Sequence, residues 1–402
     1  MITELSTPLW FVLHSMLYGI ACGALLTFVP FLRLRKKQLI AYWLVNLLIF
    51  GFWLGSQFTS ENWLTTHRWA QWPVALWLNA SMAYFALAAS VVGLRVLFWL
   101  IRHHPKKPFL LNPNPILIPF VWLMSAYGTY EALQEPQLKH YDVYLADLPT
   151  NMEGFRFAQI TDSHIGDFVS SEELRQAVLR LNNEKPDLLV MTGDLIDDER
   201  QLDDAFQALS ESNAPLGVIG ILGNHEKYHG LKQILAKYQT ESKVAPIQLL
   251  VDQHTERTYH GQKFQITGVD FPMAPNTRGV KVEESEEEHD MAGSVIRAFD
   301  GIKPDEWNLL LAHHPNTFDF IESQNAELTV AGHTHGGQVL PLGYTVGRYR
   351  YHFHYLKGWF QRQQQQLYVS VGMGGVWPYR LGVPKEIVTF TLHRQTSAEK
   401  AQ

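Results

Sequence analysis

The side chains with the strongest potential for chemistry stand in five short groups between residues 162 and 335. Each group contains carboxylate, amide or imidazole donors and follows a short apolar run. The groups are Asp162-Ser163-His164, Gly193-Asp194, Gly223-Asn224-His225-Glu226, His313-His314 and Gly332-His333-Thr334-His335. Donors of these types suit divalent cations such as Mn²⁺, Fe or Zn²⁺. An aspartate can bridge two cations, and two metals about 3.5–4 Å apart can clamp the attacking and leaving oxygens of a displacement at phosphorus.

The last group lies in the stretch AGHTHGGQ, residues 331–338, directly after an apolar run. Side chains at positions i and i+2 of an extended segment point to the same side. His333 and His335 are therefore expected to face one site, with one histidine for each metal. The two glycines that follow are expected to bring the backbone close to a substrate phosphate. Taken by itself, the stretch also fits two surface histidines before a turn.

The elements that must position these groups are short apolar strands alternating with amphipathic helices. The pattern predicts strands at 155–161, 187–192, 216–222, 307–312 and 327–330, and helices at 171–183 and about 202–212. This alternation is typical of a layered α/β domain. Ligands of open α/β sheets gather beyond the carboxyl ends of the strands. The five groups are therefore expected to meet in one crevice.

Each group taken alone also has an ordinary structural explanation. Asp162 could cap a turn, Gly193-Asp194 could be a turn, and Asn224 could be the N-cap of a helix. The repetition is the informative feature, because all five predicted strands end in Asp, Asn or His.

As a set and in this order, the five groups resemble the motif series of the calcineurin-like metallophosphoesterases, over about residues 153–392. The GGQ after His335 and the stretch GGVWPYR at 374–380 resemble a bacterial branch with membrane segments in front. Relatives of that branch include phosphodiesterases and UDP-diacylglucosamine pyrophosphatases of lipid A synthesis. The resemblance implies N-terminal transmembrane helices followed by an α/β metallophosphoesterase domain, a four-layer αββα sandwich.

The resemblance also implies a site for two divalent metal ions, Mn²⁺ first, with Fe or Zn²⁺ as alternatives. In this reading Asp162, His164 and His335 hold the first metal, Asp194 bridges to the second, and Asn224, His313 and His333 complete the second. His225 would protonate the leaving group or stabilise charge on the phosphoryl oxygens. The implied reaction is in-line attack of metal-bound hydroxide on phosphorus. Ser163 stands where an apolar residue is more usual in the family, and His314 stands at a variable position.

Residues 1–130 are expected to form a transmembrane region of four helices, at about 9–32, 39–58, 74–101 and 109–130. A helix needs roughly 20 apolar residues to cross the hydrocarbon core, and the first three runs meet this requirement. The fourth contains Asn112, Asn114 and three prolines, and its cleanly apolar part is 116–130. The first run is too long, and too soon followed by the second, for a cleaved signal peptide.

Basic residues follow the first run at 33–37 and the third at 102–107. Because such residues favour the cytoplasmic side, the amino terminus is expected outside. A fourth span then places the domain at 136–402 outside as well. The expected localisation is a bacterial inner membrane with an extracytoplasmic domain. If the fourth run only dips into the membrane, the domain faces the cytoplasm.

The charge of the chain is divided unequally between its two parts. Residues 1–130 hold 9 Lys and Arg against 2 acidic residues, whereas the remainder holds 24 against 37. An acidic domain argues against nucleic acid as a partner, because phosphate backbones bind to basic surfaces. The expected partners are the lipid bilayer and a phosphorylated, lipid-linked substrate. The only cysteine, Cys22, excludes an intrachain disulfide and a cysteine zinc cluster.

Three regions are expected to shape substrate specificity. Arg348 and Arg350, in the stretch 343–355, could form a basic wall for a second phosphate, and Arg380 could act likewise, because a guanidinium suits bidentate phosphate contacts. A surface salt bridge is the alternative for each arginine. The acidic insertion at about 273–295 shows no periodicity and is expected to be a solvated, mobile loop. A lid over the site is the alternative.

The function expected from these features is a membrane-anchored, metal-dependent phosphohydrolase. Its substrate would be a phosphodiester, phosphomonoester or pyrophosphate, lipid-associated or from the cell envelope. The first alternative is a UDP-diacylglucosamine pyrophosphatase, which would act on the cytoplasmic face. An alternative of another class is a non-catalytic membrane sensor or transporter with a ligand-binding domain. The near absence of charge inside the apolar runs argues against a transport path.

Overall fold

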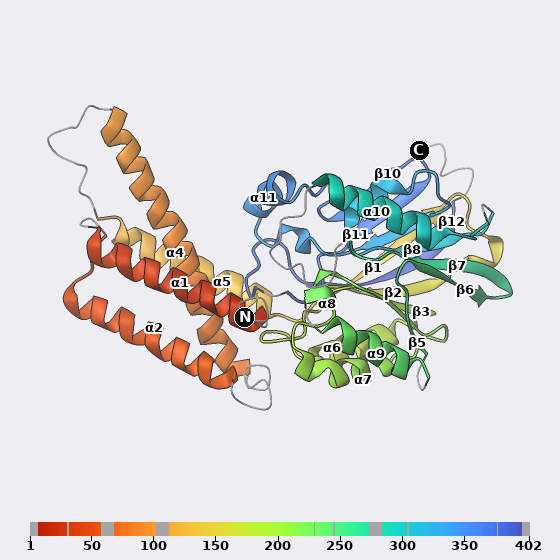
Figure 1. The fold of residues 1–402 in the computed structure, drawn as a ribbon, viewed down its shortest axis with the longest axis horizontal. Coiled ribbons are helices and arrows are strands. Elements are labelled where there is room, and N and C mark those ends of the chain that lie inside the picture. Colours follow the sequence, from red (N-terminus) through yellow and green to blue (C-terminus); the bar gives the residue numbers. More distant parts are fainter. Residues whose placement is uncertain are drawn as a thin grey trace. The chain divides into compact units, whose positions relative to one another are not determined.

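The computed structural model describes residues 7–29, 32–57, 68–101, 112–228, 230–243, 246–272, 284–303, 305–375 and 377–395. The chain forms two compact units (Figure 1). The helical unit comprises Met1–Leu133 and Trp377–Arg380, and the α/β unit comprises Gln134–Val376 and Leu381–Gln402. The basic segment expected at 102–107 lies outside the described residues.

The helical unit contains the helices α1 (Thr7–Phe28), α2 (Lys36–Gln57), α4 (Arg68–Ile101) and α5 (Asn114–Leu133). Among the described residues, two stretches are long and apolar enough to cross a membrane, Gln71–Ile101 and Asn114–Leu133, and Met16–Phe28 is a shorter apolar stretch. The weakest predicted span is thus a 20-residue helix, although it begins at Asn114 rather than at 109. The side chain of Asn112 accepts the Asn114 backbone N–H at 2.9 Å and so caps its start.

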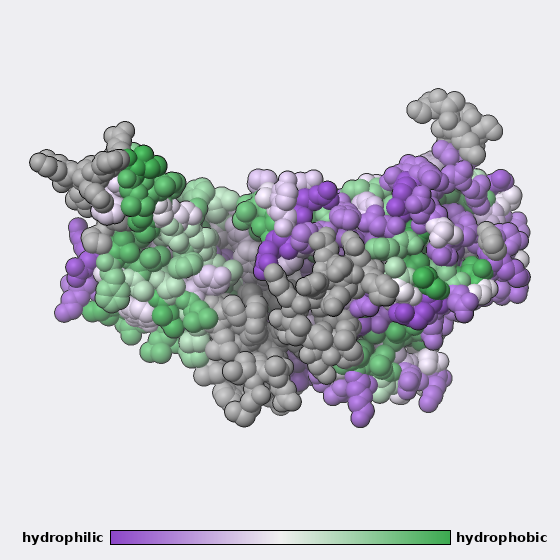
Figure 2. Space-filling view, turned by 45° about the horizontal axis from the view of Figure 1, so that its top comes forward, coloured by the Kyte–Doolittle hydropathy of each residue, from purple (hydrophilic) through white to green (hydrophobic). Residues whose placement is uncertain are grey.

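Leucine, tryptophan and phenylalanine side chains cover much of the outer surface of these helices. Leu47 and Leu48 are 67% and 70% exposed, for example. In Figure 2 the described surface of the helices is mostly hydrophobic, whereas the α/β unit is mostly hydrophilic. An apolar surface of this extent is unusual for a protein surrounded by water. The outer surface of these helices is suited to apolar surroundings.

A short segment from the far end of the sequence, Trp377–Arg380, belongs to the helical unit. Asn79 of α4 donates to the Pro378 carbonyl at 2.9 Å and accepts the indole N–H of Trp377 at 2.7 Å. The Arg380 backbone N–H donates to the carbonyl of Gly128 on α5 at 3.0 Å. Hydrogen bonds therefore satisfy a buried amide within an otherwise apolar helix.

The α/β unit is built on two six-stranded sheets. The first sheet has the order β1 (Gln137–Leu145), β12 (Glu386–Arg394), β2 (Arg156–Ile160), β3 (Leu188–Thr192), β4 (Val218–Ile221) and β5 (Ile247–Leu249). The second has the order β10 (Gly358–Arg362), β11 (Gln365–Val369), β9 (Leu328–Ala331), β8 (Asn308–Leu311), β7 (Gln262–Gly268) and β6 (Gln253–Tyr259). All five predicted strands are present, each within two residues of its expected start.

The core of the α/β unit lies in three layers. Between the sheets, Phe157 and Val190 of the first sheet pack with Leu309 and Val330 of the second. The helices α6 (Ser171–Asn183), α7 (Leu202–Ser210) and α9 (Leu231–Glu241) pack on the outer face of the first sheet. The helix α10 (Glu284–Phe299) and the short helix η3 (Pro315–Phe320) pack on the second. The two sheets therefore lie between two helical layers.

The helix α6 shows why its predicted bounds, 171–183, agree with the structure. The Ser170 side chain accepts the Glu173 backbone N–H, and the Glu173 carboxylate accepts the Ser170 N–H, which is a complete capping box. Leu174, Val178 and Leu181 form its buried face, with the spacing of an amphipathic helix. The local sequence is therefore sufficient to predict the bounds of α6.

The expectation of an aperiodic, mobile loop at 273–295 is wrong for the part that the structure describes. Residues from Glu284 onward form α10, and Met291, Val295, Ala298 and Phe299 are buried along one side of it. The acidic run at 283–288 hides this periodicity, because the apolar positions begin only after it. The remainder of the insertion lies outside the described residues.

Candidate metal centre

The five groups of polar side chains all follow strands, but they follow strands of two sheets. Asp162, Asp194 and Asn224 come after β2, β3 and β4, which are parallel neighbours in the first sheet. His313 and His333 come after β8 and β9, parallel neighbours in the second. Hydrogen bonds join the two sheets at this point. The His333 backbone N–H, for example, donates to Asp162 Oδ1 at 3.0 Å.

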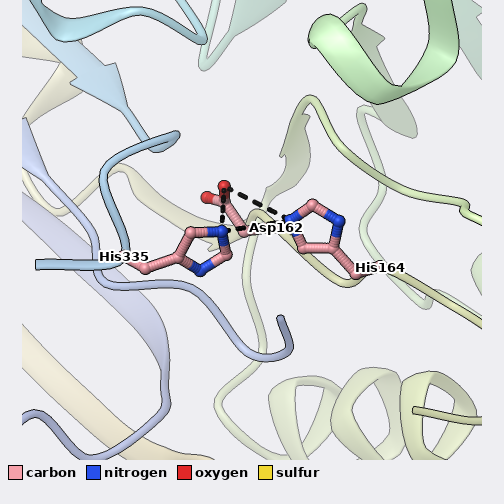
Figure 3. A group of neighbouring side chains, drawn as sticks. All are labelled: Asp162, His164 and His335. Atoms are coloured by element: carbon pink, nitrogen blue, oxygen red, sulfur yellow. Dashed lines mark hydrogen bonds and ion pairs between the residues drawn. The ribbon is translucent and has the colours of Figure 1, made fainter. Parts of the chain in front are cut away.

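The first donor group consists of Asp162, His164 and His335 (Figure 3). His164 Nε2 lies 3.1 Å from His335 Nε2 and 4.0 Å from Asp162 Oδ1, and His335 Nε2 lies 3.5 Å from the same oxygen. Two ligands that each bind one metal at about 2.1 Å stand roughly 3.0–3.4 Å apart, depending on the coordination angle. The two separations from His335 Nε2, 3.1 and 3.5 Å, are close to this range, and the 4.0 Å between His164 Nε2 and Asp162 Oδ1 is wider. A small shift of one side chain would let all three donors bind one ion.

The second donor group consists of Asp194, His313 and His333. Asp194 Oδ2 lies 3.1 Å from His313 Nε2 and also 3.5 Å from His164 Nε2 of the first group. The His313 Nδ1–H donates to the Thr192 carbonyl at 2.7 Å. The electron pair on His313 Nε2 is therefore available to bind a metal. Asp194 thus stands between the two groups, where a bridging carboxylate would stand.

Asn224 provides an independent test of whether a metal fits. It opens the short helix α8 (Asn224–Tyr228) and is 7% exposed, yet its side-chain oxygen has no hydrogen-bond partner among the described residues. A buried polar atom without a partner is costly in a folded protein. A cation on Asn224 Oδ1 removes that cost, so the donor set fits two divalent metals.

Asp197 is a site residue that the sequence did not single out. One of its oxygens, Oδ1, lies 2.5 Å from His225 Nδ1 and 3.3 Å from His164 Nδ1. These three residues also form a compact donor group, but 2.5 Å is a hydrogen-bond distance and is too short for two ligands of one ion. Asp197 therefore orients the two rings. In the sequence, only its position three residues after Asp194 pointed to a role for Asp197 at the site. Asp198 next to it is equally acidic, so the sequence could not distinguish the two.

Glu226 closes the third group of the sequence, but no role for it followed from the sequence. Its carboxylate is 2% exposed and accepts the backbone N–H groups of Gly223, Asp194 and Leu195 at 2.7, 3.0 and 2.6 Å. It therefore ties the loop after β4 to the loop after β3. Both loops carry proposed ligands, so the role of Glu226 is to hold those ligands in register.

The charges of the cluster are strongly coupled. Burial would lower the pKa of His164, but Asp197, Asp194 and Asp162 together raise it to about 9. Burial likewise opposes protonation of His313, and Asp194 raises its pKa to about 9. The pKa of His333 is well below its ordinary value because of burial. The carboxylates thus attract positive charge, and metals would compete with protons for the same atoms.

The two histidines of the AGHTHGGQ stretch do not use strand geometry, contrary to expectation. β9 ends at Ala331, and both His333 and His335 adopt left-handed backbone conformations, with φ of 72° and 49°. Asp162, His164 and Asp194 do so too, with φ of 52°, 48° and 53°. Such conformations cost of order 1–3 kcal/mol each and concentrate at functional sites. The turn sends His335 to the first group and His333 to the second.

The glycines after His335 pack tightly against the protein's own chain, and their expected approach to a substrate phosphate stays a prediction. A Cβ on Gly336 would meet Val371 Cγ1 at 2.7 Å, and one on Gly337 would meet the Gly343 backbone at 2.7 Å. Both have positive φ, 61° and 77°. They are required for tight packing of the protein's own chain.

Gly332 lies where the backbone passes against a proposed ligand, and it supports a testable prediction. A Cβ there would overlap Thr161 Oγ1 and Asp162 Oδ2. We expect Gly332→Ala to displace the Asp162 carboxylate, to lower the free energy of unfolding by about 1–3 kcal/mol, and to reduce the bound metal. The measurements are elemental analysis and thermal unfolding of the purified full chain.

Gly293→Ala in α10 is the matched control, because a Cβ there meets only the Arg297 side-chain end, at 3.1 Å. It is expected to raise the free energy of unfolding by about 0.5–1 kcal/mol and to leave the metal content unchanged. Normal metal content in Gly332→Ala would show that Asp162 is not a ligand.

The predicted substrate-binding arginines differ in their surroundings. Arg348 and Arg350 are exposed on the helix α11 (Leu342–Arg350), and neither forms an ion pair with another described residue. Arg380 is buried and belongs to the helical unit. Their contact with a substrate stays a prediction. His314 is buried, with its ring 5.0 Å from that of His333.

Comparison with known proteins shows which proteins this chain is similar to. A family model described as calcineurin-like phosphoesterase matches residues 155–337. The metallophosphoesterase YkuE of Bacillus subtilis is 31% identical over 281 residues, covering 67% of this chain and 90% of that protein. The metallophosphoesterase Cj0846 of Campylobacter jejuni is 28% identical over 263 residues, covering 65% of this chain and 64% of that protein. A transmembrane protein with metallophosphoesterase domain of Danio rerio is 25% identical over 287 residues, covering 67% of this chain and 60% of that protein.

Proposed function

Because this chain belongs to the calcineurin-like metallophosphoesterases, we propose that it is a membrane-anchored hydrolase of a lipid-associated or cell-envelope phosphoester or pyrophosphate. The α/β unit is a dinuclear, metal-dependent phosphoesterase. The single observation that supports the site is the position of Asp194 between two donor groups. Membrane anchoring is supported by the two candidate membrane helices and by the transmembrane relative.

We assign the ligands by the two donor groups. Asp162, His164 and His335 would hold one divalent ion, and Asn224, His313 and His333 the other, with Asp194 shared. When bound, the ions supply an acidified water and positive charge against the phosphoryl oxygens. Mn²⁺ is our first choice, with Fe or Zn²⁺ as alternatives, because mixed oxygen and imidazole donors suit all three.

The protein's own contribution to proton transfer is the pair Asp197 and His225. Burial would raise the pKa of Asp197, but His225 and His164 lower it below its ordinary value, so Asp197 is a carboxylate. It accepts the Nδ1–H of His225 at 2.5 Å. Nε2 is thereby left to face the substrate, where a protonated ring would donate to the leaving oxygen or stabilise phosphoryl charge.

We place the active site on the extracytoplasmic side of a bacterial inner membrane. The support is the basic segment at 33–37 after α1 and the basic segment at 102–107 after α4, which favour the cytoplasm. A site on that side cannot serve a cytoplasmic UDP-linked lipid precursor. The orientation therefore favours a phosphodiesterase or phosphatase over a UDP-diacylglucosamine pyrophosphatase.

One experiment tests both the activity and the orientation. Spheroplasts producing the full chain receive bis-p-nitrophenyl phosphate, which is charged and does not cross membranes, with and without a chelator and added Mn²⁺. We expect equal hydrolysis in intact and lysed spheroplasts, loss of at least nine tenths of it with the chelator, and recovery with Mn²⁺. Cells with an empty vector give the background.

The outcomes separate the two parts of the proposal. Hydrolysis that emerges only after lysis would keep the activity and reverse the orientation. Absence of metal-dependent hydrolysis before and after lysis would contradict the assignment as a phosphodiesterase. A purified chain that binds two metals and hydrolyses no phosphoester would favour a ligand-binding sensor.

A further inference from the structure

The large apolar side chains exposed on the α/β unit are concentrated on one helix. Within the described part of that unit, eight large apolar side chains are exposed, and five of them fall between residues 342 and 351. These five are Leu342 (64% exposed), Tyr344 (58%), Val346 (37%), Tyr349 (78%) and Tyr351 (59%). All lie on α11 or directly after it (Figure 1). The concentration marks this segment as a contact surface.

The way α11 packs explains why these side chains point outward. It meets the rest of the unit through glycines: a Cβ on Gly343 would overlap the Gly337 backbone, and one on Gly347 would meet Leu356 Cδ1 at 2.9 Å. A surface helix of a soluble protein normally turns its large apolar side chains inward. In α11 the inward side is glycine, and the large side chains face away from the protein.

The sequence around α11 carries basic residues and no acidic ones, although the chain as a whole is acidic. No Asp or Glu occurs between Glu327 and Glu386, and that stretch contains six Lys and Arg residues. Two of them, Arg348 and Arg350, are exposed among the tyrosines of α11. A helix of exposed tyrosine, leucine and arginine has the chemistry of a membrane interface, where anionic headgroups meet the acyl chains.

We propose that α11 and Tyr351 form an interfacial segment that binds the surface of an anionic lipid bilayer, with the tyrosines and Leu342 at the acyl boundary and Arg348 and Arg350 on lipid phosphates. The bilayer is favoured over a protein partner by the connectivity of the chain. Only residues 134–136 separate the end of the candidate membrane helix α5 from the start of β1. Three extended residues span about 10 Å, so an anchored chain holds this unit within reach of lipid.

The segment is joined to the proposed metal site at both ends. On one side, the Gly343 N–H donates to the Val339 carbonyl, four residues after His335. On the other, the Phe353 ring packs edge-on against His333, with centroids 5.3 Å apart. A lipid-bound α11 would therefore present the headgroup phosphates to the metal site. This consequence for the substrate rests on the proposed hydrolase function, whereas the binding itself does not.

Lipid contact can be measured in the full chain reconstituted in vesicles. Cys22 is the only cysteine, so Cys22→Ser permits one fluorescent label at Tyr349→Cys or, as control, at Ile296→Cys. Ile296 is 67% exposed on α10 of the same unit. In vesicles of phosphatidylcholine and phosphatidylglycerol at 3:1, doxyl lipids are expected to quench the label at 349 at least threefold more than that at 296. Arg348→Gln with Arg350→Gln is expected to at least halve that quenching.

Equal quenching at 349 and 296 would overturn the proposal. So would a label at 349 that doxyl lipids do not quench and that is nevertheless shielded from aqueous iodide, because that result means that a protein covers α11. Quenching that is equally strong in pure phosphatidylcholine would overturn the role of the arginines and of anionic lipid.

Activity separates this inference from the hydrolase proposal. Leu342→Ser with Tyr349→Ser is expected to lower hydrolysis of the vesicle phospholipid about tenfold and to change hydrolysis of bis-p-nitrophenyl phosphate less than twofold. Ile296→Ser is the matched control and should change neither. If the unaltered chain hydrolyses neither substrate while label 349 is quenched, the hydrolase proposal fails and the interfacial segment stands.

Discussion

Replacing Asp194 with alanine is expected to reduce phosphodiester hydrolysis by about a thousandfold or more, because the metal charge that it organises contributes several kcal/mol to the transition state. Its Oδ2 lies within 3.5 Å of His164 Nε2 and 3.1 Å of His313 Nε2, one donor from each group. Its Oδ1 accepts the backbone N–H of His225 at 2.9 Å. The measurement is steady-state hydrolysis of bis-p-nitrophenyl phosphate by the purified full chain, together with its metal content.

Two further variants distinguish loss of the bridging charge from misfolding of the Asp194→Ala chain. Asp194→Asn keeps an acceptor for the His225 N–H but removes the bridging charge, so we expect a folded chain with a similar loss of activity. Asp198→Asn changes a carboxylate of the same loop, which pairs with Arg200 at 2.7 Å, and should change activity less than threefold. A folded Asp194→Asn chain with full activity and two metals would show that Asp194 does not bridge.

Replacing His225 with glutamine is expected to reduce hydrolysis by about 10²–10⁴-fold without loss of metal. The reason is its geometry. The His225 Nδ1–H donates to Asp197 at 2.5 Å. We therefore expect His225 Nε2 to face the substrate and the ring not to bind a metal. An alkyl leaving group needs a proton more than p-nitrophenolate does, so the loss should be larger for the alkyl ester. Rates with both leaving groups, and elemental analysis, check this expectation.

Asp197→Asn tests the positioning role of the carboxylate in the same assay. It should lower kcat by a smaller factor than His225→Gln and keep the same dependence on the leaving group. His254→Gln is the control for a histidine elsewhere, since the His254 ring bonds to the Ala298 carbonyl. If His225→Gln loses a metal and slows both leaving groups equally, His225 is a ligand rather than a proton donor.

Local sequence was sufficient where each element carries its own signals. The five strands and α6 follow from short apolar runs, an amphipathic spacing and a capping box at Ser170 and Glu173. It was insufficient for α10, where the acidic run conceals the apolar side formed by Met291, Val295 and Ala298. That side is buried only because the second sheet lies beneath it.

The candidate site shows the same division. The types and order of the donors could be read from the chain, because each stands at the end of an apolar strand. Asp197 could not be distinguished from Asp198, since both are acidic residues in one turn. Only the position of the His164 and His225 rings gives Asp197 its role. The outward face of α11 was likewise hidden, because the glycines that hold it are informative only once their neighbours are known.

The sequence by itself determined the donors, their order and the strands that precede them, since these depend on residue type and short-range periodicity. The tertiary structure alone decided which donors lie together in one group. β2, β3 and β4 belong to one sheet and β8 and β9 to the other, so the donor groups exist only where the two sheets pack. It also decided that His333 and His335 separate, because left-handed backbone at both positions turns them to different groups. Interactions between residues far apart in the chain set these features, and no local pattern records them.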